Sequence, residues 1–222
     1  MKKCLIINVS GTFARFRKPY TTTSALSFMC IHPLAAKGLL GAILGVEKEN
    51  LYSYFKDTSI GLQVITEIRK DMGSYNLISN VVKNGALRFP SNVEFLRDVK
   101  YRLFIHEEEQ LLQQLKKVIE ARQFVFTPYL GASEHIAHIE VEQVEEVNNS
   151  VERATCCVIP KQLVELEDIN ISKIYTDKLP IRNNEKREYT AYEQVIIPVG
   201  YEVIKVKSNC LYQVGGEHVY FF

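Results

Sequence analysis

The stretch CLIINV, residues 4–9, is the feature on which the fold prediction rests, because it is a nearly continuous apolar run. A short run of this kind is typical of a strand that is covered on both faces. We therefore predict a central strand here. The polar and basic residues GTFARFRKPYTTTS follow, and they predict a long loop after the strand.

A helix is predicted next, because Pro33 is tolerated in a first helical turn and Gly45 is a typical helix stop. Gly38 and Gly41 lie three residues apart and therefore share one helix face. Two glycines on one face allow a strand or a ligand to approach the backbone closely, and packing is the reading we favour.

Two more strands and a second helix are predicted further along the chain. SIGLQVIT at residues 59–66 indicates a strand, and FLRDVKYRLFIH at residues 95–106 alternates apolar and polar side chains. EEEQLLQQLKKVIEAR at residues 107–122 has one apolar stripe, with glutamates in its first turn and basic residues toward its end, as the helix dipole favours. Residues 123–131 and 135–141 follow as extended segments.

The order strand, helix, strand, strand, helix, strand is that of an α+β, ferredoxin-like (RRM-like) domain. We expect this domain to occupy residues 1–142. Residues 143–222 contain short apolar runs and the hairpin signal Gly215-Gly216. They predict a smaller β-rich C-terminal lobe.

The net charge of +1 hides an asymmetry between the two halves of the chain. Residues 1–104 carry 15 Lys and Arg against 7 Asp and Glu, and the remainder carries 12 against 19, so the halves are about +8 and −7. This difference favours a basic working face on the N-terminal half. Charge scattered over solvated surfaces is the simpler alternative.

The cysteines favour a reducing cytoplasm, because they are five in number and show no C-x-x-C spacing. No metal site is expected from His135 and His138 either, since residues three apart on a strand point to opposite faces. The first apolar run ends too early for a signal peptide, and residues 31–46 fall short of the roughly 20 residues that a membrane-spanning helix needs. We expect a cytoplasmic protein with no membrane role.

Residues 13–24 carry the densest functional signal, because basic and aromatic side chains are interleaved there and hydroxyl side chains follow. Guanidinium and ammonium groups bind phosphates, aromatic rings stack on unpaired bases, and hydroxyls bond phosphate or the ribose 2′-OH. A loop that merely covers the sheet could have the same composition, and spacing alone leaves both readings open. The candidate RNA-binding residues are Phe13, Arg15, Phe16, Arg17, Lys18, Tyr20, Thr21 and Thr22.

Three stretches carry a resemblance to a known family. INVSGTFARFRKPYTTTSALSF at residues 7–28 and HPLAAKGLLGAILG at residues 32–45 look like the N-terminal signature of the fifth CRISPR-associated (Cas) protein family, and PYLGASEHIAHI at residues 128–139 resembles its later turn and strand. The resemblance implies a RAMP-superfamily protein that caps the 5′ handle of the guide RNA (crRNA) in Cascade, the type I surveillance complex of antiviral defence. Lys37 and Gly38, on the helix packed nearby, join the candidate RNA-binding residues.

The resemblance also implies a thumb-like insertion that reaches the guide and contacts the neighbouring backbone subunit. We place it in the irregular segment 69–92, where Arg69, Lys70, Lys83 and Arg88 supply positive charge between turn-prone residues. A simple surface loop is the alternative. The implied partners are crRNA, the Cascade backbone subunit and large subunit and, indirectly, target DNA; no cofactor is expected.

One branch of the same family gives an alternative function, that of a metal-independent endoribonuclease that matures crRNA. The adjacent Lys-His pair associated with that branch is missing, since no histidine of this chain directly follows a lysine. A cleaving arrangement could still assemble from Tyr20, Lys37 and His32, with the imidazole as general acid or base. A ferredoxin-like regulator that binds a small ligand is a third reading, and absence of RNA affinity at any salt concentration would favour it.

Charge reversal at Arg15 and Arg17 tests the RNA-binding reading. If these side chains neutralise phosphates, the double variant binds the handle more weakly and its affinity depends less on salt. Titration of labelled RNA at several salt concentrations measures both effects. Unchanged binding would count heavily against this site.

Overall fold

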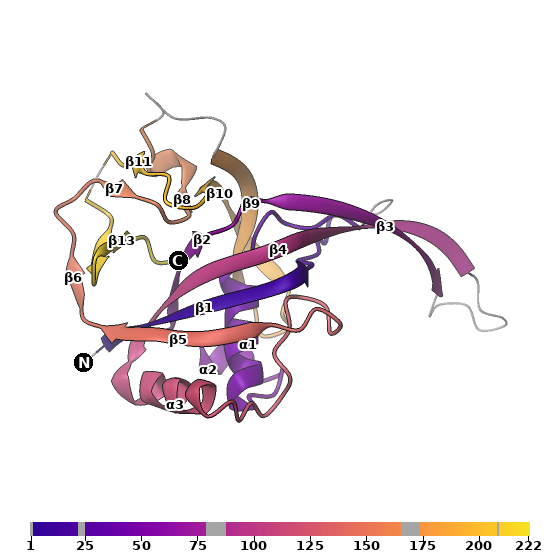
Figure 1. The fold of residues 1–222 in the computed structure, drawn as a ribbon, viewed down its shortest axis with the longest axis horizontal. Helices are drawn as coiled ribbons and strands as arrows, with labels where there is room; N and C mark the ends of the chain where they lie inside the picture. The colour runs from indigo at the N-terminus through magenta and orange to yellow at the C-terminus, as the bar shows by residue number, and fades with distance from the viewer. Residues whose placement is uncertain (1, 22–24, 79–87, 166–173, 208) are drawn as a thin grey trace.

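The computed structural model describes residues 2–21, 25–78, 88–165, 174–207 and 209–222, and its centre is a five-stranded antiparallel sheet (Figure 1). The strands follow the spatial order β2-β4-β1-β5, and β3 pairs with β4 outside that path. The elements of this part are β1 (Lys2–Ala14), α1 (Pro33–Leu44), α2 (Leu51–Tyr54), β2 (Ser59–Val64), β3 (Arg69–Ile78), β4 (Arg88–Glu108), α3 (Glu109–Glu120) and β5 (His138–Glu145).

This arrangement confirms the ferredoxin-like prediction. Along the chain, β1, α1, β2, β4, α3 and β5 follow in the expected order, and β1 and β4 are the two central strands of the sheet. α1 and α3 lie together on one side of the sheet in Figure 1, and the C-terminal strands lie mainly on the other. The predicted strand at residues 59–66 corresponds to β2.

The two faces of β1 are both buried, as the apolar run predicted. Leu5, Ile7 and Val9 belong to the main hydrophobic cluster, which also contains the buried side chains of both long helices. Cys4 and Ile6 point the other way, into a second cluster that contains residues of the C-terminal part of the chain. The strand therefore joins two cores.

The first long helix has the ends that the sequence predicted. Pro33 occupies its first turn, and the helix stops at Gly45, which adopts a left-handed φ of 75°. A Cβ at Gly41 would lie 2.2 Å from a methyl carbon of Leu51, so the glycine allows α1 and α2 to pack closely. A Cβ at Gly38 would meet nothing within 4 Å, so the two glycines serve different purposes.

The start of the second long helix and the segment after it differ from the prediction. Glu107 and Glu108 belong to β4, where they pair with Lys3 and Lys2 of β1, so α3 starts only at Glu109. Residues 121–137, all of them described, form turns and one isolated bridge instead of a first extended segment. At Glu107 and Glu108, strand pairing has therefore overridden the helix-start signal. In residues 121–137, turns take the place of the extended backbone that the sequence predicted.

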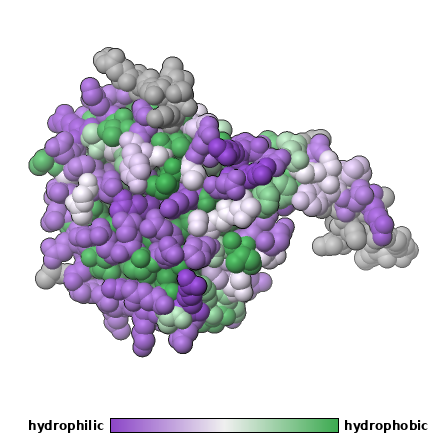
Figure 2. Space-filling view, viewed as in Figure 1, coloured by the Kyte–Doolittle hydropathy of each residue, from purple (hydrophilic) through white to green (hydrophobic). Residues whose placement is uncertain are grey.

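In the described part of the segment 69–92, residues 69–78 and 88–92, the chain is regular, which corrects the sequence prediction for those residues. β3 and the first part of β4 pair continuously from Arg69↔Arg97 to Ile78↔Arg88, and this two-stranded arm projects from the body of the molecule (Figure 1, Figure 2). Residues 69–76 and 90–92 of the arm are largely exposed. Burial begins only at the base of the arm, where Val93 and Phe95 pack with Ala25. A ribbon that is buried only at its base shows little of the alternation that reveals a half-buried strand.

The C-terminal part is rich in short strands, as predicted, and forms three small sheets of order β8-β10-β9, β11-β7 and β13-β12-β6. The Gly215-Gly216 turn joins β12 to β13. Leu179 and Val195 extend into the main hydrophobic cluster of the ferredoxin-like part. The elements are β6 (Val147–Asn149), β7 (Ala154–Thr155), β8 (Ile159–Pro160), η1 (Lys161–Leu163), β9 (Ile174–Asn183), β10 (Tyr189–Pro198), β11 (Ile204–Lys205), β12 (Tyr212–Val214) and β13 (Glu217–Val219).

Among the described residues, no helix is both long and apolar enough to cross a membrane.

Substitution of Gly131 by alanine is expected to destabilise the fold. Gly131 has a φ of +85°, and a Cβ there would lie 2.0 Å from the carbonyl oxygen of Arg15. The positive φ and the steric clash together should lower the free energy of unfolding by about 2 kcal/mol or more, which corresponds to a loss of about 4–8 °C in Tm. Thermal denaturation measures it. Gly216→Ala is the matched control, because its Cβ meets nothing within 4 Å, and equal Tm values for the two variants would contradict the prediction.

Candidate functional site

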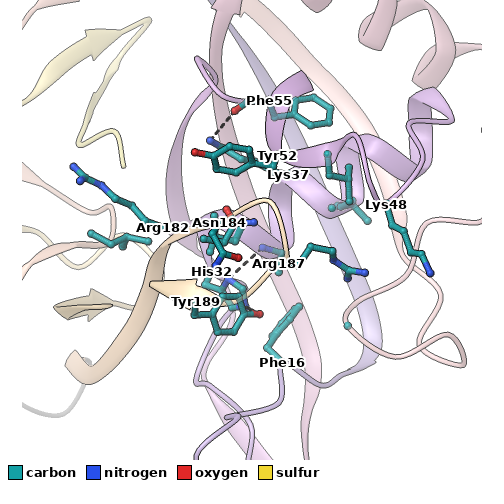
Figure 3. A pocket seen from close by; sticks show the side chains of 18 of the residues that line it. Phe16, His32, Lys37, Lys48, Tyr52, Phe55, Arg182, Asn184, Arg187 and Tyr189 are labelled. Carbon is teal, nitrogen blue, oxygen red and sulfur yellow. Dashed lines mark hydrogen bonds between the residues drawn. The ribbon is translucent and has the colours of Figure 1, made fainter. Parts of the chain in front are cut away.

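A basic groove of about 910 Å³ runs beside α1 and is the candidate functional site (Figure 3). Residues from the loop that follows β1, from α1 and α2, and from the end of β9 and the β9–β10 turn line it, with Tyr129 and Gly131 of the α3–β5 connection. Asp and Glu are absent from its described lining. The seven cationic residues that line it are Arg15, Arg17, Lys37, Lys48, Lys56, Arg182 and Arg187.

Arg15 and Arg17 reach the groove because the chain continues in an ordered path beyond β1. The backbone N–H of Arg15 donates to the carbonyl of Leu130 over 2.9 Å, and Arg17 forms an isolated bridge with Ser27. The Nε of Arg15 is buried and has no hydrogen-bond partner in the described structure. Burial and the neighbouring Arg17 lower the pKa of Arg15. A bound anion would relieve both the repulsion and the unpaired donor.

The α1 side of the groove brings together Lys37 and Gly38. The Nζ of Lys37 donates to the carbonyl of Phe55 over 2.9 Å, as the dashed line in Figure 3 marks, and burial lowers the pKa of this lysine. Gly38 lines the groove one residue further along. Because a Cβ at this position meets no other atom within 4 Å, the glycine leaves the helix backbone open to a ligand.

His32 lies at the inner end of the groove and has a structural task. Its Nδ1 accepts a hydrogen bond from the backbone N–H of Ala35 over 3.1 Å, which caps the start of α1. Its Nε2 lies 3.3 Å from the hydroxyl of Tyr189. The side chain is buried, and burial lowers the pKa of His32 to about 3. The imidazole is therefore neutral at physiological pH.

Four cationic residues of the groove were missed by the sequence analysis: Lys48, Lys56, Arg182 and Arg187. The last two belong to the C-terminal part, whose residues had no assigned role. The sequence does contain a signal, since RNNEKREY at residues 182–189 combines three basic residues with turn-prone asparagines. Only the fold shows that this turn meets α1.

Other predicted residues of the 13–24 segment lie outside the groove or inside the core. Lys18 forms an ion pair of 2.7 Å with Asp177 of β9, and both side chains are largely buried. Phe16 is buried between the rings of Tyr101 and His32, although its edge lines the groove. Tyr20 is 56% exposed. Thr21 donates a hydrogen bond to the carbonyl of Lys18, and Thr22 lies outside the described residues.

The predicted residues of the arm are separate from the groove. Lys70 pairs with Glu94 over 2.9 Å, and Arg69 lies 3.4 Å from the carboxylate of Glu67. Arg88 is exposed at the start of β4, whereas Lys83 lies outside the described residues. Phe13 sits at the base of the arm, where its ring meets those of Phe95 and His135.

The described ranges contain no group of three or more His, Cys, Asp and Glu side chains placed to hold a metal ion.

Comparison with solved structures defines the class of this fold. A CRISPR protein from Archaeoglobus fulgidus is similar with a TM-score of 0.58 and 15% identity, covering 99% of this chain and 98% of that one. A chain of a CRISPR RNA-guided surveillance complex is similar with a TM-score of 0.56 and 11% identity, covering 93% and 92%. The chain therefore shares its fold with these CRISPR-associated proteins.

A family model described as "CRISPR-associated protein (Cas_Cas5)" matches residues 4–155, well over half of the 222 residues. The chain therefore belongs to the CRISPR-associated Cas5 family. This confirms the resemblance carried by residues 7–28 and 32–45. No sequence among the curated proteins matches the chain.

Acid should destabilise the protein through His32, and His32→Asn should reduce the effect. The unfolded chain protonates this imidazole near its ordinary pKa of 6.5, whereas the folded state keeps it neutral down to about pH 3. Between these values the unfolded state binds more protons, so stability falls as the pH is lowered. Asparagine also caps a helix but does not titrate.

The measurement is the free energy of unfolding by urea between pH 4 and pH 7. The slope should be smaller in the variant by up to about 1.4 kcal/mol per pH unit. Parallel slopes for the variant and the wild type would show that His32 is not the titrating group.

Proposed function

We propose that this chain is a non-catalytic subunit of a type I CRISPR surveillance complex, Cascade, in which it binds crRNA and caps its 5′ handle. The observation that carries the proposal is the groove beside α1, with its seven cationic side chains and no carboxylate in its described lining. Uncompensated positive charge in a concave site favours a polyanion, and RNA phosphates are the polyanion that this family's setting supplies.

The groove also has features suited to a single strand. Tyr52, Tyr129 and Tyr189 line it together with the cations, and aromatic rings beside basic groups are the usual platform for unpaired bases. Gly38 leaves backbone accessible between them. These features support binding to an unpaired RNA segment such as the handle.

The arm supports a role in assembly. Met72 and Tyr75 are about half exposed on β3, and exposed apolar side chains on a projecting ribbon are suited to contact with a partner protein. We propose that the arm contacts the backbone subunit and the guide, and that the large subunit and the target DNA are met through the assembled complex. The likeness to a chain of a surveillance complex supports this assignment.

The nuclease alternative has weaker support. A general acid or base works best with a pKa near the operating pH, whereas the pKa of His32 is about 3 and both of its ring nitrogens have partners. Tyr20 packs against Phe28 and Tyr192 and is absent from the described lining of the groove. These contacts therefore do not favour a cleaving arrangement of Tyr20, Lys37 and His32.

Gly38→Glu tests the proposed function at the groove. The new side chain has room, and glutamate is a better helix former than glycine by about 1 kcal/mol, so folding should be unharmed. The added carboxylate should weaken binding of single-stranded repeat RNA about tenfold or more. Gly38→Lys is the matched control, because it adds similar bulk with the opposite charge and should bind the RNA more tightly than Gly38→Glu does.

The readout is fluorescence anisotropy of 3′-labelled repeat RNA, followed by gel analysis of the same samples. RNA that stays intact, and that binds to the wild type and to Gly38→Lys but poorly to Gly38→Glu, supports the proposed non-catalytic role of capping the handle. Defined metal-independent cleavage would instead establish the endoribonuclease. No affinity of the wild type at low salt would overturn RNA binding altogether.

A further inference from the structure

The β9–β10 hairpin, Ile174–Pro198, is fixed against the loop that follows β1. The buried Asp177 of β9 accepts a hydrogen bond from Lys18 Nζ over 2.7 Å and another from the backbone N–H of Met29 over 2.9 Å. Because a buried carboxylate is costly unless it is paired and hydrogen-bonded, this contact holds the strand in one place. Lys18 thus acts as a positioning residue.

A second contact fixes the hairpin near its turn. The hydroxyl of Tyr189 lies 3.3 Å from His32 Nε2, and the two rings meet edge to face with their centroids 5.4 Å apart. In Figure 3 the pale orange turn between β9 and β10 carries Asn184, Arg187 and Tyr189 to His32. The turn is therefore held over the start of α1, where it forms a wall of the groove.

The turn holds its own carboxylate away from the groove lining. The side-chain amide of Asn184 donates to Glu188 Oε2 over 2.7 Å, and its oxygen accepts from the backbone N–H of Glu188 over 2.9 Å. Neither Glu185 nor Glu188 is among the described residues that line the groove, whereas Arg182 and Arg187 are. The turn thus offers the groove only positive charge.

Arg187 occupies a backbone position that normally favours glycine or asparagine. Its φ is +64°, in the left-handed region, where a residue with a Cβ costs free energy. An arginine at this position lowers the stability of the fold, while its side chain lines the groove. Strained residues of this kind cluster at ligand-binding sites.

We propose that the β9–β10 turn is the second wall of the RNA site and that Arg182 and Arg187 neutralise phosphates of the bound single strand. This inference rests on the proposed function and adds to it a part of the chain beyond residue 155, where the family match ends. The ligand is a single-stranded ribonucleotide segment that passes between α1 and the turn. The bound segment would contact both the ferredoxin-like part, which the family model matches, and the C-terminal part.

Arg187→Gly separates a binding role from a structural one, because the two effects have opposite signs. Glycine adopts the left-handed φ without the strain that an arginine has there, so the Tm should stay the same or rise. Loss of a phosphate contact should weaken RNA binding roughly tenfold and lower the magnitude of the salt slope by about 1. The probe is the 3′-labelled repeat RNA, titrated at several salt concentrations.

Arg122→Gly is the matched control. Arg122 also has a left-handed φ, of 53°, and is exposed, but it follows α3 and is not among the described residues of the groove lining. Both variants lose one positive charge and gain the same backbone freedom. Only Arg187→Gly should bind RNA more weakly.

The outcomes separate this inference from the proposed function. If charge reversal at Arg15 and Arg17 weakens binding while Arg187→Gly binds like the wild type, the inference is overturned and the proposed function stands. Equal weakening by Arg187→Gly and Arg122→Gly also overturns it, because the effect would then reflect net charge alone. If wild-type protein does not bind the RNA, both are overturned.

Discussion

The burial of β1 on both faces is the constraint on which the rest of the structure depends. Leu5, Ile7 and Val9 attach the helices to one face of the strand, and Cys4 and Ile6 attach C-terminal residues to the other. A strand covered in this way needs partners from both halves of the chain. The same strand then leads directly into Arg15 and Arg17, so the groove begins just beyond its far end.

The sequence predicted those parts of the fold whose burial leaves a local pattern. A continuous apolar run indicated β1, an apolar stripe indicated α3, and local rules for helix ends placed Pro33 and Gly45 correctly. The arm could not be predicted as a regular ribbon, because its side chains are buried only at its base, around Val93 and Phe95, and backbone pairing orders the rest. At Glu107 and Glu108, pairing with β1 outweighed a favourable helix start.

The lining of the candidate groove was predictable only where its residues are close in sequence. Arg15 and Arg17 were predicted from a local pattern, Lys37 and Gly38 from the family resemblance, and the structure brings all four to one groove. Arg187 was missed because it joins them through tertiary structure. The same limit explains Lys18, which looks like its basic neighbours but is paired with a carboxylate 159 residues away.

The Lys18–Asp177 ion pair also orders events during synthesis. The first half of the chain emerges from the ribosome long before Asp177, so the groove starts as an open face with only part of its positive charge. Contacts of such large sequence separation form late, since a long loop must close before they are made. The contact between Lys18 and Asp177, and with it the second wall of the groove, should therefore form only once nearly all of the chain has been translated.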